Sequence, residues 1–268
     1  MWSENHTNGQ WRVCFRQFGI LSGLDQIPGD TKWQDEEQAI EEEKTQLRGL
    51  LGGAKWRSYQ TGPQHSARLG LLHSEISHPT VKTLRSANKL CREMYQHRQT
   101  SVKLQNLEVN DPADIDFVAC TGAALGNRPN GESTGGYTIA ATSGHMLEGK
   151  ASRLNFVSWK SGRLHRIARS SLAAEVQAFS EAEVELMFVR LQWSEMLGHE
   201  YPTMSPQESV IKVPGTLVAD SRSLYDIVIN EGRNEIQWSR IEGQVLGPRS
   251  SQYSAAFEDE QYHRAVGA

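Results

Sequence analysis

Cysteine is scarce in this chain, with three residues among 268, at positions 14, 91 and 120. An odd number of cysteines without the short paired spacing of metal ligands argues against a disulfide framework and against a zinc site. Long apolar runs are missing too, and none approaches the roughly 18 residues of a membrane span. The first residues lack the basic-then-apolar pattern of a secretory signal. We therefore expect an intracellular protein, cytoplasmic or nuclear, without a membrane partner.

An excess of positive charge is also missing, because 28 Lys and Arg residues stand against 32 Asp and Glu residues, for a formal net charge of −4. This balance excludes a surface that is basic throughout, but it is compatible with a local basic patch. A hydrophobic content of 38% and a mean hydropathy of −0.55 lie on the polar side for a globular chain. We expect a folded middle with poorly packed ends.

The first 110 residues divide into an irregular part and a helical part. Residues 1–35 mix tryptophan with polar residues and show no sustained period, which predicts an irregular segment. Residues 36–110 contain three helical stretches. The first opens with acidic residues and continues with basic ones, which complements a helix dipole. Pro63 and Pro79 open the second and third.

The third stretch also carries a basic face. Four basic residues recur at steps of three, four and three, which places them on one side of a helix: Lys82, Arg85, Lys89 and Arg92. Such a stripe could follow a phosphate backbone and so bind nucleic acid. A solvated helix face is the alternative interpretation.

Residues 111–230 are predicted to form a mixed α/β domain. Four stretches favour β-strands, at 114–121, 136–142, 153–159 and 215–220. A Gly-, Asn- and Pro-rich turn separates the first two. A long helix is expected from Ser171 to about Leu197, and a short one over 223–229. Residues 231–268 are polar and aperiodic and predict a disordered tail.

The long helix has an apolar stripe with one charged exception. The stripe consists of Leu172, Phe179, Ala182, Leu186, Val189, Trp193 and Met196. Three residues after Leu172, where a stripe residue is due, the sequence has Glu175. A capping box does not explain it, because with Ser171 as cap the required Glu or Gln position is Ala174. A hydrated helix start, favoured by the dipole, and a metal ligand remain as alternatives.

The metal interpretation has a partner for Glu175. Asp220 ends the apolar strand candidate 215–220, a place where α/β proteins commonly position ligand-binding groups. Two carboxylates from a helix start and a strand end can hold Mg²⁺ or Mn²⁺, which prefer oxygen ligands. A basic run leads into the same helix and would attract a polyanion: Lys160, Arg163, Arg166 and Arg169.

Several ordered runs resemble one family. STGGYTIA, SWKSGRLHRIARSSLAAEVQAFSEAEVEL and LVADSRSLYDI are similar to the ribonuclease H-like domain that ends the polymerase polyprotein of copia-type LTR retrotransposons. Upstream, EEEKTQLRGLLGGAKW, SARLGLLHSEI and TVKTLRSANKL resemble the helical segment that joins reverse transcriptase to that domain. The resemblance covers roughly residues 36–230.

The resemblance implies a mixed five-stranded sheet flanked by helices and Mg²⁺- or Mn²⁺-dependent cutting of the RNA strand of RNA/DNA hybrids. It also implies acidic ligands at the end of the first strand, on the first long helix and at the end of the fourth strand, followed by a later fourth ligand. Glu175 matches the second of these positions and Asp220 the third. The first falls in CTGAALGNRPNG, where Gly122 replaces the family's Asp. Asp116 lies six residues earlier, about 20 Å along an extended strand, so it cannot substitute.

Three hypotheses follow. The chain is a ribonuclease H-like domain that has lost most or all hydrolysis, or an active nuclease whose site is completed by another ligand or a partner chain. Alternatively, it is a non-catalytic nucleic-acid-binding or assembly fragment of a retroelement polyprotein, which would act with other parts of that polyprotein. The sequence leaves open whether the protein is an enzyme.

Overall fold

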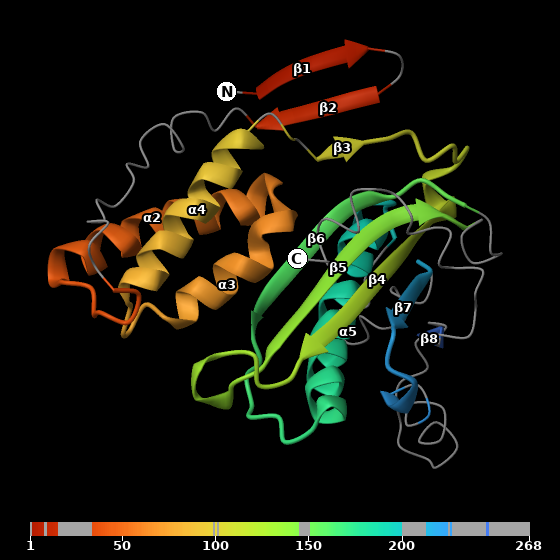
Figure 1. The fold of residues 1–268 in the computed structure, drawn as a ribbon. Coiled ribbons are helices and arrows are strands. Elements are labelled where there is room, and N and C mark those ends of the chain that lie inside the picture. Colours follow the sequence, from red (N-terminus) through yellow and green to blue (C-terminus); the bar gives the residue numbers. More distant parts are fainter. Residues whose placement is uncertain are drawn as a thin grey trace.

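The chain has a mixed α/β fold in which one long helix packs on a sheet and three helices lie beside the sheet (Figure 1). The structure is a computed structural model, and it describes the following residues: 2–7, 10–15, 34–98, 100, 102–144, 151–199, 213–224, 226 and 245–246.

The helical part contains the three predicted helices, which are α2 (Glu41–Thr61), α3 (Ser66–Ser74) and α4 (Val81–Gln96). A 3₁₀ turn, η1 (Pro63–His65), precedes α3. The α2 start is stabilised by the Glu43 carboxylate, which accepts a 3.0 Å hydrogen bond from the Ile40 N–H and lies in an acidic first turn. The three helices share a core built mainly from Leu47, Leu50, Leu51, Ala54, Leu69, Leu84, Leu90 and Met94.

The main sheet has the strand order β6-β5-β4-β7-β8. Its strands are β4 (Ile115–Ala124), β5 (Thr134–Ser143), β6 (Asn155–Arg163), β7 (Gly215–Ala219) and β8 (Val245–Leu246). Strands β4, β5 and β6 form antiparallel pairs, whereas β7 lies parallel to β4 and β8 parallel to β7. The four predicted strands are therefore confirmed, with shifted ends. The parallel pairing places the carboxyl ends of β4 and β7 at the same edge of the sheet.

The predicted long helix is α5 (Ser171–Met196), which packs across β4, β5 and β7. Its buried residues meet the sheet in a core that includes Phe117, Ala119, Ile139, Phe179, Ala182, Leu186, Val189 and Leu217. Leu172 and Trp193 are half-buried against that core. The prediction that Met196 belongs to the stripe is wrong, because its side chain is 75% exposed. Met196 is the last residue of α5, and the next residue, Leu197, makes the core contact at this end.

The helical part contacts the sheet at β6, next to α3. Trp159 Nε1 on β6 donates a 2.9 Å hydrogen bond to the Ser58 carbonyl of α2. In the turn between β4 and β5, Arg128 Nη1 donates a 2.9 Å bond to the Gly70 carbonyl of α3. These bonds fix the three helices beside the β6 edge of the sheet, as Figure 1 shows.

The N-terminal prediction needs correction. Instead of an irregular segment, β1 (Trp2–Thr7) and β2 (Gln10–Phe15) pair antiparallel, and β2 also pairs with β3 (Lys103–Leu104). Asn-Gly at positions 8 and 9 is a strong short-range hairpin signal that needs no sustained period in the flanking sequence.

The C-terminal prediction falls mostly outside the described residues. Residues 245–246 of the expected tail form β8, contrary to the prediction for those two positions, and the rest of 231–268 lies outside. Of the short helix expected over 223–229, residues 223, 224 and 226 are helical, and the others are not described. Among the described helices, none combines the length and apolar character that crossing a membrane requires.

Candidate metal centre

The two predicted metal ligands both lie near the edge of the sheet where β4 and β7 end. The last pair of the parallel ladder joins Thr121 to Ala219, so Asp220 directly follows the ladder beside Gly122. Helix α5 begins on the same side of the molecule after its cap Ser170, whose hydroxyl accepts a 3.1 Å bond from the Ala173 N–H. Glu175 lies in the second turn of this helix. A helix start and two strand ends thus converge.

Within the described part of the chain, Glu175 is bound through one of its two carboxylate oxygens. Its Oε1 accepts a 3.2 Å hydrogen bond from the Ala123 N–H. Ala123 extends beyond the last β4–β7 pair, so this N–H needs a partner other than β7. Glu175 Oε2 is buried and has no hydrogen-bond partner among the described residues. A buried carboxylate oxygen without a partner is the group that a cation would stabilise.

The pKa of Glu175 also reflects its position beside Asp220. Burial raises the pKa of Glu175, the Ala123 hydrogen bond lowers it, and the negative charge of Asp220 raises it. The Asp220 carboxylate therefore interacts electrostatically with Glu175, although Asp220 itself is exposed. Two neighbouring carboxylates that raise a pKa by repulsion are typical of sites that bind a cation.

Position 122 has room for a side chain. A Cβ added to Gly122 would meet no atom of the described residues within 4 Å, beyond its immediate neighbours. Strand alternation directs this Cβ to the face opposite Ala123. Asp116 lies near the opposite end of β4, opposite Thr142, and burial raises the pKa of its carboxyl. The expectation that Asp116 is too far away to replace a ligand at position 122 is confirmed.

The basic run before α5 is partly neutralised by acidic side chains. Lys160 Nζ forms a 2.7 Å ion pair with Glu181, and Arg163 Nη1 a 2.6 Å ion pair with Glu132. Arg166 and Arg169 are exposed, and among the described residues neither forms an ion pair. Within this run, Arg166 and Arg169 therefore carry positive charge that no described acidic side chain pairs with.

The second basic set lies on α4, which packs on α2 and α3. Lys82, Lys89 and Arg92 are exposed, and Arg85, also exposed, forms an ion pair with Asp35. The stripe is therefore a solvent-facing side of α4, as the spacing predicts. Nothing in the described contacts joins it to Glu175.

Sequence reasoning missed the backbone partner of Glu175. The partner is a backbone N–H, which the residue type at position 123 does not reveal. This N–H can bind Glu175 because the β4–β7 pairing stops at Thr121 and Ala219. Thr121 was also missed, although its buried Oγ1 has no partner among the described residues. Thr121 directly precedes Gly122 in the sequence, and this position is the signal from which it could have been predicted.

The donor set fits part of a divalent-cation site. Glu175 and Asp220 supply the carboxylate oxygens that Mg²⁺ and Mn²⁺ prefer. Among the described residues, however, no group of three or more His, Cys, Asp or Glu side chains could hold a metal ion. No known protein family, curated protein or solved structure matches the chain.

Proposed function

We propose that the chain is a ribonuclease H-like domain derived from the polymerase polyprotein of a copia-type LTR retrotransposon. Its activity would be metal-dependent hydrolysis of the RNA strand of RNA/DNA hybrids, impaired because Gly122 replaces the first metal-binding Asp. The observation that carries this proposal is the convergence of Gly122, Glu175 and Asp220 at one edge of the sheet.

The fold supports the proposal. A mixed five-stranded sheet, with a long helix packed across it and a helical segment before it in the chain, is what the family resemblance implies. The three positions that correspond to the family's first three acidic ligands come from β4, α5 and the end of β7, as the resemblance requires.

The chemistry assigns a role to each residue. Bound divalent cations would position the attacking water and stabilise the leaving oxygen of the phosphodiester. Glu175 would hold the cation through Oε2, since Oε1 is occupied by Ala123, and Asp220 would supply a second carboxylate. Glycine at position 122 offers no oxygen from a side chain, so the affinity for metal and the rate of hydrolysis should both fall.

Nucleic-acid binding would depend on the basic residues near α5. Arg166 and Arg169 would contact phosphates directly, and Lys160 and Arg163 would do so after exchanging their acidic partners for phosphate.

Metal binding provides a test that does not depend on turnover. In calorimetric titrations with Mn²⁺, Gly122→Asp should bind at least about tenfold more tightly than the native chain. Asp220→Asn should weaken the remaining binding, whereas Asp226→Asn is the matched control, because Asp226 is exposed and lies 3.7 Å from Arg222 in an ion pair. The proposed metal site would be contradicted if the two Asn variants changed the Mn²⁺ affinity equally, or if Gly122→Asp did not increase it.

A non-catalytic nucleic-acid-binding or assembly role is the second candidate, favoured by the exposed stripe on α4. The double variant Lys82→Gln and Lys89→Gln should weaken binding of an RNA/DNA hybrid under this alternative and leave it unchanged under the first proposal. Hybrid binding that is unaffected by this double variant would argue against the stripe as an interface.

A further inference from the structure

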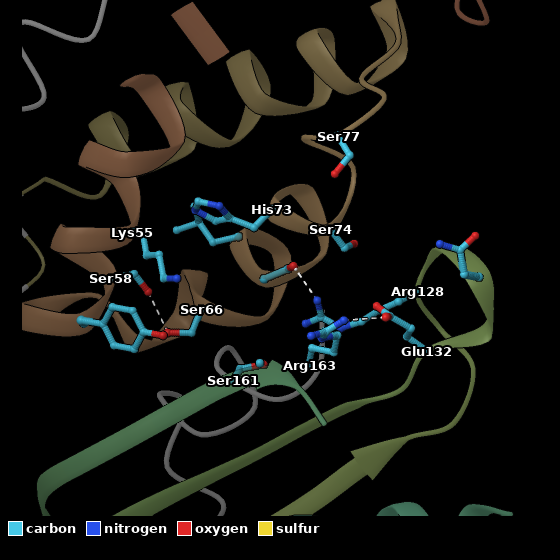
Figure 2. A pocket seen from close by; sticks show the side chains of 15 residues that line it. Lys55, Ser58, Ser66, His73, Ser74, Ser77, Arg128, Glu132, Ser161 and Arg163 are labelled. Atoms are coloured by element: carbon cyan, nitrogen blue, oxygen red, sulfur yellow. Dashed lines mark hydrogen bonds and ion pairs between the residues drawn. The ribbon is translucent and has the colours of Figure 1, made fainter. Parts of the chain in front are cut away.

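A cleft of about 470 Å³ lies between the helical part and the sheet, away from Glu175 (Figure 2). Helices α2 and α3 form one wall, and the turn between β4 and β5 forms the other together with the end of β6. The polar side chains that line it include Lys55, Ser66, His73, Arg128, Glu132 and Arg163.

Arg128 is the most unusual group in this cleft, because its side chain is only 7% exposed. Nε donates a 2.8 Å bond to Thr134 Oγ1 and Nη1 donates a 2.9 Å bond to the Gly70 carbonyl, so both partners are neutral. Nη2 is buried and has no hydrogen-bond partner among the described residues. The nearby acid Glu132 is bound instead by Arg163. A buried guanidinium without a carboxylate partner is costly unless an anion compensates it.

The other charged side chains of the cleft also favour an anion. Among the described residues that line it, Lys55, Arg128 and Arg163 stand against a single acid, Glu132, in a chain whose net charge is −4. The Lys55 ammonium lies 5.7 Å from the centre of the Tyr59 ring and is exposed. Burial lowers the pKa of His73, so its imidazole is neutral near pH 7 and adds no charge.

Hydroxyl groups complete the lining. Ser58, Ser66, Ser74, Ser77 and Ser161 line the cleft. The Ser58 and Ser74 hydroxyls donate to the Gly62 and Leu71 carbonyls, so the hydroxyl donors for a ligand are Ser66, Ser77 and Ser161. Serine hydroxyls and Arg or Lys side chains are the usual partners of phosphate oxygens. The volume lies within the roughly 300–1,000 Å³ range of sites for small ligands.

We propose that this cleft binds the phosphate group of a nucleotide, either free or within a nucleic-acid strand. The inference does not depend on the metal centre, since none of the lining residues belongs to it. Ser161, which lines the cleft, pairs with Gly136 of β5, which in turn pairs with Gly122 of β4. The cleft therefore lies along the same sheet edge as Gly122, two strand spacings away, or about 10 Å.

Calorimetric titration of the full chain with AMP and with adenosine, at fixed ionic strength, tests the proposal. AMP should bind and adenosine should bind at least about tenfold more weakly, because only AMP carries the phosphate. Lys55→Gln should weaken AMP binding about tenfold, and Lys55→Glu should weaken it further. Arg48→Gln is the matched control, because it removes one positive charge from an exposed site on the same helix outside the cleft.

Two results would overturn the inference: equal affinity for AMP and adenosine, or equal effects of Lys55→Gln and Arg48→Gln. Both Lys variants change an exposed side chain, so folding is preserved and the comparison stays interpretable. A competition with short single-stranded DNA distinguishes the two sources of phosphate. Displacement of AMP identifies the strand as a ligand of this cleft, and persistence of bound AMP identifies a free nucleotide.

Discussion

Glu175 Oε1 on α5 accepts a 3.2 Å hydrogen bond from the backbone N–H of Ala123 at the end of β4. This bond joins the second turn of the helix to the strand that carries Gly122. The other oxygen, Oε2, has no hydrogen-bond partner in the part of the chain that the structure describes. The side chain therefore has a structural role at Oε1 and a binding capacity at Oε2. The two roles predict different effects of mutation.

Replacement of Glu175 by Gln should stabilise the protein at neutral pH. The raised pKa means that the folded state binds the proton of Glu175 more tightly than the unfolded chain does. This contribution is present below the ordinary pKa and is lost as the pH rises through the raised value. Gln keeps an oxygen for the Ala123 N–H and removes the charge, so at pH 7 stability should rise by up to about 1 kcal/mol.

Thermal unfolding at several pH values checks this prediction. The gap in Tm between Glu175→Gln and the native chain should close below the ordinary pKa of 4.5. Glu195→Gln, at an exposed position near the end of the same helix, serves as the control. A variant that is less stable than the native chain at pH 7 would contradict the described environment of Glu175.

Two glycines at the same end of the sheet should respond in opposite ways to alanine. A Cβ on Gly135 would lie 2.4 Å from Leu164 Cδ2 and 3.2 Å from Ala178 Cβ, so Gly135→Ala should destabilise by about 1–3 kcal/mol through overpacking. Gly122→Ala meets open space and should raise stability by less than about 1 kcal/mol, because it restricts the unfolded chain.

Denaturant unfolding of the two variants measures this difference. It tests whether α5 and Leu164 pack on β5 as described while position 122 stays open. Similar losses for both variants would mean that a side chain at position 122 is not tolerated, and would weaken any test that adds one there.

Hybrid binding should depend on salt and on particular arginines. The logarithm of the binding constant should fall with the logarithm of salt concentration, with a slope near −0.9 for each phosphate neutralised. Arg166→Gln and Arg169→Gln should each lower that slope by about one such unit. Lys160→Gln should change it less, because Glu181 already neutralises that ammonium.

Fluorescence anisotropy with a labelled RNA/DNA hybrid measures these slopes. A flat response to salt would exclude this surface as a nucleic-acid interface. Equal changes for all three variants would show that the ion pair of Lys160 does not matter for binding.

The regular elements were predictable because their signals are local. The period of α5, the β-branched and aromatic content of β4 to β7, and Pro63 and Pro79 near the helix starts all lie within a few residues of the structure they specify. Glu175 also stood out as a charge in an apolar stripe. Met196 was misplaced because helical spacing alone does not show which residue at a helix end turns toward the core, and here Leu197 does so.

The contacts between distant segments were not predictable from such signals. The Ala123 N–H is available to Glu175 only because β7 ends at Ala219, which is a property of strand pairing. Arg128 lies in the predicted Gly-, Asn- and Pro-rich turn, and it bonds the Gly70 carbonyl of α3, which lies 58 residues earlier in the sequence. Charge patterns alone also failed to show that acidic partners occupy Lys160 and Arg163.

The most direct test of the central claim is cleavage of a labelled RNA/DNA hybrid with Mg²⁺ or Mn²⁺ by the native chain and by Gly122→Asp, with Asp220→Asn added to each as a control. We predict little or no cleavage by the native chain, clear cleavage by Gly122→Asp, and loss of that activity when Asp220→Asn is added. Cleavage by the native chain that Gly122→Asp does not increase, or no cleavage by either protein, would contradict a ribonuclease H-like site that lacks a single metal ligand.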